Sequence, residues 1–337
     1  MTHDRARRSG EEAYEYRVGD EAHRLRLDRY VRQRRPELGR HQVERLIRSG
    51  AVRVDQRARD PHYFLKRGQT VTINDTDSDS GSRAQSAPRL LLQTPRLIVA
   101  AKPPGMATNP VDPNESSLLA WVTEAVARAA EEASAGARDG VPATEVPIAR
   151  ARPGIVHRLD RDASGIVLFS HGPRAHRSLR AAFERRSVHR HYWVLVAGKL
   201  AGEAGEIDAP LARDAAGRWH AAEQGRPALT RFRRHAVAAG ASLLEVRPET
   251  GRTHQIRAHF AAIGHPVVGD PLYGPGTYAG PPAPRLWLHA SAVEFSRRLA
   301  AALDAPRRIE CPLWEDLADH ATGIGLADRL PPPPPPR

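Results

Sequence analysis

A polar stretch from Asn74 to Ala87 constrains the fold of this chain most strongly, because it separates the apolar residues into two groups. The stretch is rich in Asp, Ser and Gly, and none of its apolar side chains is larger than alanine. Such a segment cannot bury enough surface to join a core, so we expect a flexible linker at 76–88. The chain should therefore fold as two units, one on each side.

The shorter unit, 22–75, is predicted to contain a basic amphipathic helix. Val43, Leu46 and Ile47 recur at helical spacing, cations occupy the opposite face, and Gly50 is placed to end the helix. Two short strands are expected after it, at 51–54 and 69–73. The charged residues 1–21 that precede this unit are expected to form a flexible extension.

The longer unit, 89–325, alternates short apolar strands with helical patterns, which is typical of a mixed α/β or α+β fold. Its clearest strands are at 97–101, 166–169, 192–196 and 243–246, and its clearest helices are at 175–186 and 253–263. An Ala-rich stretch at 123–149 is expected to add a helix and a loop. The prolines near the end belong to a tail, 326–337, that we expect to be disordered.

The charge of the chain favours a polyanionic partner. Lys and Arg total 51 against 39 acidic residues, a net charge of +12, which suits nucleic acid. Most of the cations are arginines, and a GC-rich coding sequence explains that bias as well as RNA binding does. No apolar run approaches the ~20 residues of a membrane helix, and residues 1–20 lack the apolar core of a secretory signal. We expect a cytoplasmic protein without membrane contact.

One short motif in the longer unit can carry chemistry. In the sequence His157-Arg-Leu-Asp-Arg-Asp-Ala-Ser-Gly165, Asp160 is flanked by Arg158 and Arg161 just before an apolar strand. A carboxylate held among cations stays ionised and can act as a nucleophile or a base. From spacing alone, however, a structural Arg–Asp ion pair explains the motif more simply.

Further motifs add a resemblance to the RluA family of RNA pseudouridine synthases. The matching motifs are Lys102-Pro-Pro-Gly-Met106, 157–165 with Ala163 in place of the usual Thr, Arg190-His-Tyr192, and Thr250-Gly-Arg-Thr-His-Gln-Ile-Arg257. The similarity extends to 264–270, to 288–290, and to 22–75, which resembles the alpha-L RNA-binding domain of the ribosomal-protein S-four type. It implies an α+β fold with a curved mixed, mostly antiparallel sheet and a central cleft, plus a small N-terminal α/β RNA-binding domain.

The resemblance also implies a reaction. The uracil is detached from ribose at its ring nitrogen, turned over, and reattached through carbon 5, an isomerisation that needs no cofactor or metal. The family's catalytic Asp falls on Asp160, with Arg257 against it and Arg252 as the alternative cation. Tyr192 corresponds to a tyrosine that stacks on the target base, although a lone Tyr beside apolar residues is also typical of a core. Whether Asp160 attacks the sugar or removes a proton from it stays open.

Other positions are expected to contact the RNA. In the longer unit the candidate substrate-binding residues are His157, Arg158, Arg190, Arg252, His254 and Gln255. Arg190 stands where the family usually has Lys, so the charge is kept while the geometry differs. In the shorter unit the candidate RNA contacts are Arg40, Arg45, Arg48 and Arg53. The family association favours large-subunit ribosomal RNA as the substrate, and we expect a monomer.

Other functions stay open. A tRNA pseudouridine synthase and a catalytically silent RNA-binding ribosome-assembly factor would share these motifs. A glycosidase or nucleoside hydrolase would also place a carboxylate at an anomeric carbon, but it normally needs a second acid, and Asp162 is too close in sequence. A zinc enzyme is not expected, because His254 and His259 fall on different helix faces and Cys311 is the only cysteine.

Overall fold

The chain folds as two compact units, Met1–Gln85 and Ser86–Arg337. The computed structural model describes residues 7–8, 11–35, 43, 46–47, 50–74, 87–110, 116–136, 152–274 and 276–330. The linker expected at 76–88 lies, as far as residue 86, outside the described residues. Each unit has a hydrophobic core of its own.

The N-terminal unit is an antiparallel sheet with strand order β1-β2-β5-β3-β4. Its elements are β1 (Arg7–Arg8), β2 (Glu11–Arg17), the 3₁₀ turn η1 (Asp20–Ala22), α1 (Leu27–Arg34), β3 (Val52–Val54), β4 (Arg57–Ala58) and β5 (Thr70–Asn74). Val43, Leu46 and Ile47 are helical and buried in its core, as their spacing predicts. Residues 13–17 of β2 pair with β5 and residues 11–12 pair with β1, so the prediction of a flexible extension at 1–21 is wrong for residues 11–21.

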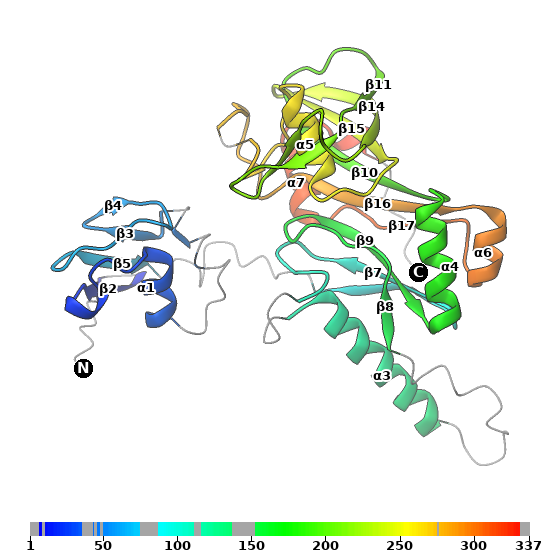
Figure 1. The fold of residues 1–337 in the computed structure, drawn as a ribbon, viewed down its shortest axis with the longest axis horizontal. Coiled ribbons are helices and arrows are strands. Elements are labelled where there is room, and N and C mark those ends of the chain that lie inside the picture. Colours follow the sequence, from blue (N-terminus) through cyan, green and yellow to red (C-terminus); the bar gives the residue numbers. More distant parts are fainter. Residues whose placement is uncertain are drawn as a thin grey trace. The chain divides into compact units, whose positions relative to one another are not determined.

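The second unit is built on a ten-stranded mixed sheet, with order β11-β14-β15-β10-β16-β9-β7-β6, β17 on β16 and β8 on β9 (Figure 1). Its strands are β6 (Arg89–Gln93), β7 (Leu97–Lys102), β8 (Pro153–Ile155), β9 (Ser164–His171), β10 (Val188–Ala197), β11 (Ala204–Asp208), β14 (Leu229–Ala238), β15 (Ala241–Pro248), β16 (Leu288–Phe295) and β17 (Arg308–Glu310). A separate hairpin joins β12 (Leu211–Arg213) to β13 (Trp219–Ala221). Only β9 and β16 pair in parallel among the described strands, which confirms the predicted α+β fold with a mixed, mostly antiparallel sheet.

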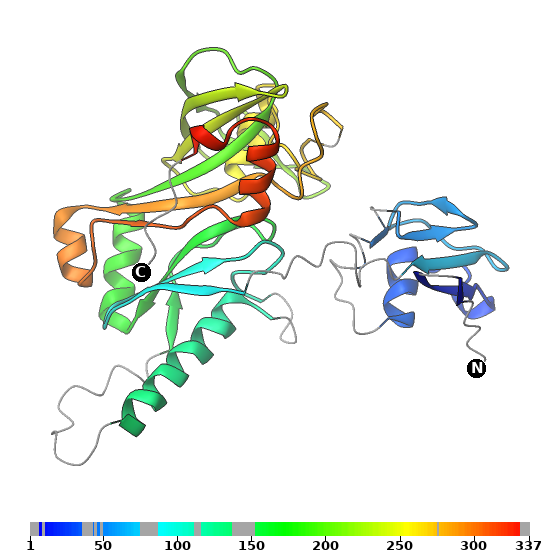
Figure 2. The ribbon, with the colours of Figure 1, turned by 180° about the vertical axis from the view of Figure 1, so that it is seen from behind.

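Helices cover both faces of the large sheet (Figure 2). Alternate residues of β7 and β9 enter two different cores: Ile98 and Phe169 pack in one, and Val99 and Leu168 pack in the other. Because both faces are covered, the central runs 97–101 of β7 and 166–169 of β9 are continuously apolar rather than alternating with polar residues. The first core includes residues of α3 (Leu118–Gly136), α5 (Gln255–Ala262) and α7 (Glu315–Gly323), and the second includes residues of α4 (Pro173–Glu184) and α6 (Arg297–Leu303).

The folded part of this unit continues past residue 325. Leu326 is buried in the first core, and the 3₁₀ turn η3 (Ala327–Arg329) follows it. The prediction of a disordered tail at 326–337 is therefore wrong for 326–330, because one apolar side chain anchors this end of the chain. The proline run at 331–336 lies outside the described residues.

Candidate active site

The loop that carries Asp160 joins β8 to β9 and is fastened on both sides of that residue. The fully buried Lys102 ammonium donates to three backbone carbonyl oxygens at 2.7, 2.8 and 2.9 Å, and one of these belongs to Arg161. Thr108 Oγ1 exchanges hydrogen bonds with the backbone N–H and C=O of Leu159, both at 3.1 Å. These contacts fix the backbone directly before and after Asp160.

Gly165 ends this loop at the start of β9, where β9 meets β16. Its φ of +111° lies in a region that other residues rarely adopt, and a Cβ atom there would stand 2.1 Å from the carbonyl oxygen of Ala290. The parallel pairing of Gly165 with Ala290 brings the two backbones together. Only glycine permits this approach, which sets the position of the loop over the sheet.

Arg257 links Asp160 to a second, buried carboxylate. Its Nη1 donates to Asp160 Oδ2 at 3.1 Å, while Nε and Nη2 donate to the two oxygens of Asp270 at 2.7 and 2.9 Å. Backbone N–H groups of Leu272 and Tyr273 donate to Asp270 in turn. Burial opposes the charge of Arg257, but Asp270 and Asp160 outweigh it and raise the pKa of Arg257 above its ordinary value. The guanidinium is therefore a fixed cation beside Asp160.

His254 and Tyr273 complete the surroundings of this ion pair. His254 has left-handed backbone geometry with φ of 53°, so α5 begins one residue later, at Gln255. Its Nε2 lies 3.9 Å from Asp160 Oδ2, and its Nδ1 contacts the Tyr273 hydroxyl at 3.2 Å. Burial lowers the pKa of His254 although Asp160 opposes the shift, and burial raises the pKa of Tyr273 to about 12. The ring of Tyr273 also covers Arg257, at 5.2 Å from its guanidinium carbon.

Tyr192 and Arg190 enter the site from β10. The pairing of β10 with β16 shifts register between His191 and Tyr192, and such bulges re-aim side chains near functional sites. Tyr192 is 6% exposed, and burial raises the pKa of its hydroxyl, with Arg190 opposing. Arg190 Nη2 donates to the carbonyl oxygens of Pro248 and Thr250 at 3.4 and 2.7 Å. Its charge thus sits beside the tyrosine and holds the loop after β15.

His157 and Arg158 lie on the other wall. His157 Nε2 accepts a hydrogen bond from the backbone N–H of Leu168 at 2.9 Å, and its ring packs on Phe183 at 5.0 Å. Burial, with a smaller contribution from Arg190, lowers the pKa of His157 to about 3, so the ring is neutral. The exposed Arg158 donates to Thr253 Oγ1 at 2.8 Å.

Gln255 and Arg252 hold the loop between β15 and α5. The Gln255 amide donates to Leu229 O and Thr230 Oγ1, each at 3.0 Å. Its carbonyl accepts from Thr250 Oγ1 at 2.7 Å and from the backbone N–H of Arg252 at 3.0 Å. Because the protein uses both ends of this amide, the predicted substrate contact by Gln255 gives way to a proposed positioning role. Arg252 does not contact Asp160; its Nε donates to a backbone carbonyl at 3.1 Å.

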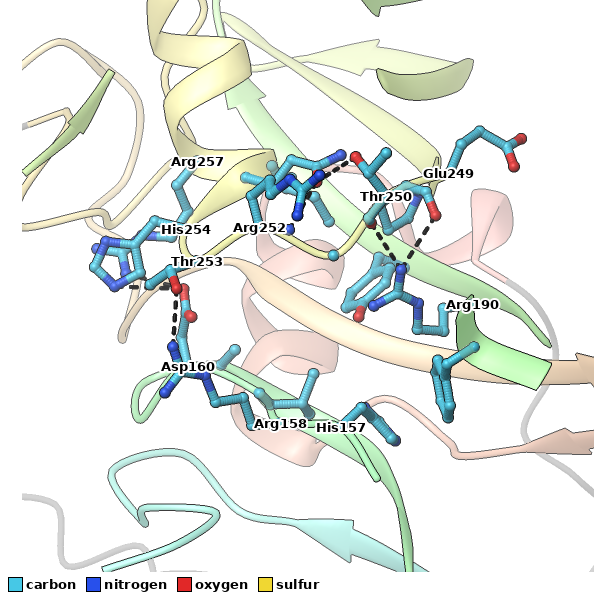
Figure 3. Close-up of a pocket in the computed structure, with 18 of the residues that line it drawn as sticks. His157, Arg158, Asp160, Arg190, Glu249, Thr250, Arg252, Thr253, His254 and Arg257 are labelled. Carbon is cyan, nitrogen blue, oxygen red and sulfur yellow. Dashed lines mark hydrogen bonds and ion pairs between the residues drawn. The ribbon is translucent and has the colours of Figure 1, made fainter. Parts of the chain in front are cut away.

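All nine residues proposed from the sequence for catalysis or substrate binding line one pocket (Figure 3). They are His157, Arg158, Asp160, Arg190, Tyr192, Arg252, His254, Gln255 and Arg257. The cavity has a volume of about 450 Å³, which is in the usual range for a small organic ligand. Asp160 lies where the β8–β9 loop faces the loop before α5.

Sequence reasoning missed Asp270 and Tyr273, which position Arg257. Asp270 lies in the segment 264–270 whose resemblance to the family was recognised without a role. An acidic residue buried to 2% exposure needs a cationic partner, but burial is not visible in a short polar segment. Thr253, the partner of Arg158, was likewise part of a recognised motif without an assigned role.

The RNA contacts proposed for the N-terminal unit are described only in part. Arg53 is on β3 with an exposed side chain, and its Nε donates to the Gly50 carbonyl oxygen at 3.2 Å. Arg40, Arg45 and Arg48 lie outside the described residues.

Within the described ranges, no group of three or more His, Cys, Asp or Glu side chains could hold a metal ion. His259 Nε2 contacts the carbonyl oxygen of Ala209 at 2.9 Å, and Cys311 is buried. The same ranges contain no helix with the length and hydropathy required to span a membrane.

Comparisons with known proteins agree with this geometry. A family model described as RNA pseudouridylate synthase matches residues 96–262, and an S4 domain model matches 25–71. The chain is 35% identical over 257 residues to ribosomal large subunit pseudouridine synthase D of Zymomonas mobilis, covering 74% of this chain and 77% of that protein. It is 33% identical over 316 residues to the protein of that name from Nitrosomonas europaea, covering 90% and 84%.

The fold is also found in a solved structure, that of human RNA pseudouridylate synthase domain containing 4. The TM-score is 0.51 at 20% identity, covering 70% of this chain and 92% of the human chain. At this identity the likeness supports the fold alone, whereas the curated relatives extend over most of the chain. The sequence therefore predicted the family correctly: this chain belongs to the RNA pseudouridylate synthases, which are isomerases, and it carries an S4 RNA-binding domain.

Proposed function

We propose that this chain converts specific uridines of large-subunit ribosomal RNA to pseudouridine, in the cytoplasm. Two relatives at 35% and 33% identity carry that RNA in their names. An S4 domain and a net charge of +12 suit a large structured RNA, because each phosphate contact adds affinity without sequence preference. A tRNA substrate remains the second candidate.

The ion pair between Arg257 and Asp160 is the observation that supports the proposed catalytic role most directly. Arg257 occupies Oδ2 of Asp160, and no group in the described part of the chain hydrogen-bonds Oδ1. The carboxylate, whose side chain is 21% exposed, is thus aimed by a fixed cation and has one oxygen without a hydrogen-bond partner in the described part of the chain.

In the proposed reaction Asp160 acts on the ribose while the bond between C1′ and N1 of uracil breaks. It does so either as a nucleophile at C1′ or as a base that removes a ribose proton, and in both cases Asp160 is regenerated at the end. The new bond joins C1′ to C5, the hydrogen on C5 leaves as a proton, and N1 gains a proton. The buried neutral Tyr192 offers a flat surface on which the detached base can stack as it turns.

A hydrolase would need a second carboxylate to activate water. Besides Asp160, two acids line the pocket, Glu184 and Glu249. Glu249 Oε1 accepts from Arg247 at 2.7 Å and lies 3.4 Å from Arg231, so it is neutralised by two cations. Glu184 is at the exposed end of α4. The pairing of Glu249 with two arginines favours the isomerase over a hydrolase that would use Glu249 to activate water.

Mapping of pseudouridines tests this proposal. Ribosomal RNA and tRNA from cells with and without the gene are treated with a pseudouridine-specific reagent and read by reverse-transcription stops. In cells without the gene, we expect one or more stops in large-subunit RNA to be lost. The wild-type gene should restore them, and a gene with the Asp160→Asn substitution should not. If stops were lost only from tRNA, the substrate would be tRNA and not ribosomal RNA. If the purified chain released uracil from RNA, it would be a hydrolase.

A further inference from the structure

His254 occupies a strained backbone position directly before α5. Its φ of 53° lies in the left-handed region, which residues other than glycine seldom adopt, and its side chain does not cap the helix that it precedes. The side chain instead lines the catalytic pocket, beside Asp160 (Figure 3). Strain of this kind persists at functional sites, where the surrounding structure holds it in place. The backbone at His254 therefore points to a role for its side chain in the pocket.

The hydrogen bonds around His254 determine which ring nitrogen carries the proton. The backbone N–H of Trp219 donates to the Tyr273 hydroxyl oxygen at 3.2 Å, so this hydroxyl is already an acceptor. Its own proton is then placed to donate to His254 Nδ1, also at 3.2 Å. Because Nδ1 accepts, the proton of a neutral ring is on Nε2. Asp160 favours the same tautomer, since Nε2 is the nitrogen 3.9 Å from its carboxylate.

The Nε2–H group of His254 is accessible from the pocket. The side chain is 26% exposed, and Nε2 is not one of the buried polar atoms that lack a partner. At 3.9 Å it is too far from Asp160 Oδ2 for a hydrogen bond, and no described group accepts from it. Burial lowers the pKa of His254, although Asp160 opposes the shift, so the ring is neutral at pH 7. His254 thus presents one neutral donor close to the group on which Asp160 acts.

The reaction creates negative charge on the base that such a donor can stabilise. When the bond between C1′ and N1 breaks, its electron pair stays with the uracil, whichever way Asp160 acts, and the charge spreads over N1 and the carbonyl oxygens O2 and O4. O2 is next to N1, and O4 is next to C5. Turning the base about the axis through N3 and C6 exchanges N1 with C5 and O2 with O4. A donor fixed beside C1′ therefore faces a carbonyl oxygen both before and after the turn.

We propose that His254 is a catalytic residue that donates a hydrogen bond from Nε2 to the uracil carbonyl oxygen beside C1′, first O2 and then O4. The inference rests on the proposed role of Asp160 and assigns the group that stabilises the detached base. No proton leaves the imidazole in this role, so the ring stays neutral throughout. Tyr273 is a positioning residue, since its hydroxyl keeps Nδ1 an acceptor. Because the donor acts most strongly on charge that develops in the transition state, its loss should lower the rate rather than the affinity for RNA.

The test pairs variants of His254 with two substrates. These are RNA fragments in which the mapped target is either uridine or 2-thiouridine, where sulfur, a weaker acceptor, replaces O2. His254→Phe keeps a ring and removes the donor, and it should lower the single-turnover rate on uridine about 100-fold with the Kd for RNA within about twofold of wild type. His254→Gln, which offers a neutral amide donor, should recover at least about tenfold of that loss. His220→Phe is the control and should keep the wild-type rate, because His220 is exposed and does not line the pocket.

Comparison of the two substrates separates a hydrogen bond from general packing. The rate on uridine divided by the rate on 2-thiouridine should be about tenfold larger for wild type than for His254→Phe, because only the wild type loses a hydrogen bond when sulfur replaces O2. Tyr273→Phe keeps the ring over Arg257 and removes only the hydroxyl. It should lower the rate on uridine about fivefold and reduce the same ratio, and it decides the matter if His254→Phe does not fold.

Equal ratios for wild type and His254→Phe would overturn the proposal. A loss of RNA affinity without a loss of rate would also overturn it, since it would indicate an ordinary binding contact. So would a His254→Phe effect that depends on the 2′-hydroxyl, measured with a 2′-deoxyuridine target, and not on the sulfur, because the donor would then act on the ribose. An Asp160→Asn enzyme that still forms pseudouridine near the wild-type rate would instead reject the proposed role of Asp160.

Discussion

Arg257 in the catalytic pocket and Arg53 in the N-terminal unit use their guanidinium groups in opposite ways. In the pocket, Arg257 has a side chain only 5% exposed and spends three of its donors on two carboxylates. In the N-terminal unit, Arg53 is exposed, and within the described residues its side chain makes one hydrogen bond, to a backbone carbonyl of its own unit. The buried guanidinium fixes the position of Asp160, whereas we propose that the exposed one offers its charge to RNA. Substitution of Arg257 should therefore lower the rate of reaction. Substitution of Arg53 should lower the affinity for RNA and the salt dependence of that affinity.

The largest effect is expected where the pocket depends on backbone geometry. Gly165→Ala would place a Cβ atom 2.1 Å from a backbone oxygen at a positive φ, and should lower the free energy of unfolding by roughly 3 kcal/mol or more. Gly264→Ala is the matched control, because Gly264 also has a positive φ but open space around its Cβ position. All five tryptophans follow residue 120, so urea denaturation followed by tryptophan fluorescence reports on this unit. Equal losses in the two variants would contradict the close-packing argument.

A smaller but more specific loss is expected from Arg257→Lys. An ammonium keeps the charge but cannot bind both oxygens of Asp270 and reach Asp160 at once. The single-turnover rate at saturating enzyme should fall about 100-fold, while the Kd for RNA changes less than about threefold. Asp270→Asn should show the same division between rate and affinity. If Arg257→Lys weakened binding, flattened its salt dependence and left the rate unchanged, Arg257 would be a phosphate contact like the exposed arginines.

Lys102 makes the pocket region sensitive to pH. Burial lowers its pKa from 10.5 to about 7, although Asp162 and Asp160 oppose the shift. Between pH 7 and 10.5 the unfolded chain binds more protons at this residue than the folded chain does. The free energy of unfolding should therefore rise with pH in this window, by up to about 1.4 kcal/mol per pH unit from this group. Lys102→Met should remove that slope in urea denaturation at several pH values; an identical slope in both proteins would exclude Lys102 as its cause.

The smallest effect is expected from Arg53, the exposed arginine of the N-terminal unit. Arg53→Ala should weaken RNA binding about two- to threefold and lower the salt slope by no more than about 0.9, the share of one phosphate. The rate at saturating enzyme should be unchanged, and the thermal unfolding of the chain should not shift. Filter binding at several salt concentrations, with Arg128→Ala as the control, measures this. A change in rate without a change in affinity would contradict the division of roles.

The sequence predicted the fold and the pocket well because motif residues carry their own chemistry. The apolar strands at 97–101 and 166–169 are continuous runs that only a sheet covered on both faces can bury. All nine predicted pocket residues come together although they are spread over three separate segments. Family resemblance, rather than spacing, is the ground for proposing Asp160 as the catalytic carboxylate, since spacing alone fits an ordinary ion pair at least as well.

The parts that sequence could not predict depend on burial and on long-range pairing. Asp270 lies in a segment with no charge pattern around it, and only the fold brings it to Arg257. Residues 11–17 looked like a charged extension because an antiparallel strand with one face toward solvent can be polar on that face, yet β2 lies between β1 and β5 in the sheet. Leu326 shows the same limit, since one buried side chain decides whether a polar end belongs to the core.

The central claim is that Asp160 is the reacting carboxylate of an isomerase. Its most direct test is the single-turnover rate of pseudouridine formation in a large-subunit ribosomal RNA fragment, at saturating enzyme, for Asp160→Asn and Asp162→Asn. Each substitution replaces one carboxylate by an amide, and the two positions are two residues apart in the sequence. Asp162 is not among the residues that line the pocket. Asp160→Asn should lower the rate by at least about 1,000-fold with the Kd for RNA within about twofold of wild type. Asp162→Asn should keep most of the rate. An Asp160→Asn enzyme that still forms pseudouridine at a rate near wild type, or that loses only affinity, would contradict the assignment.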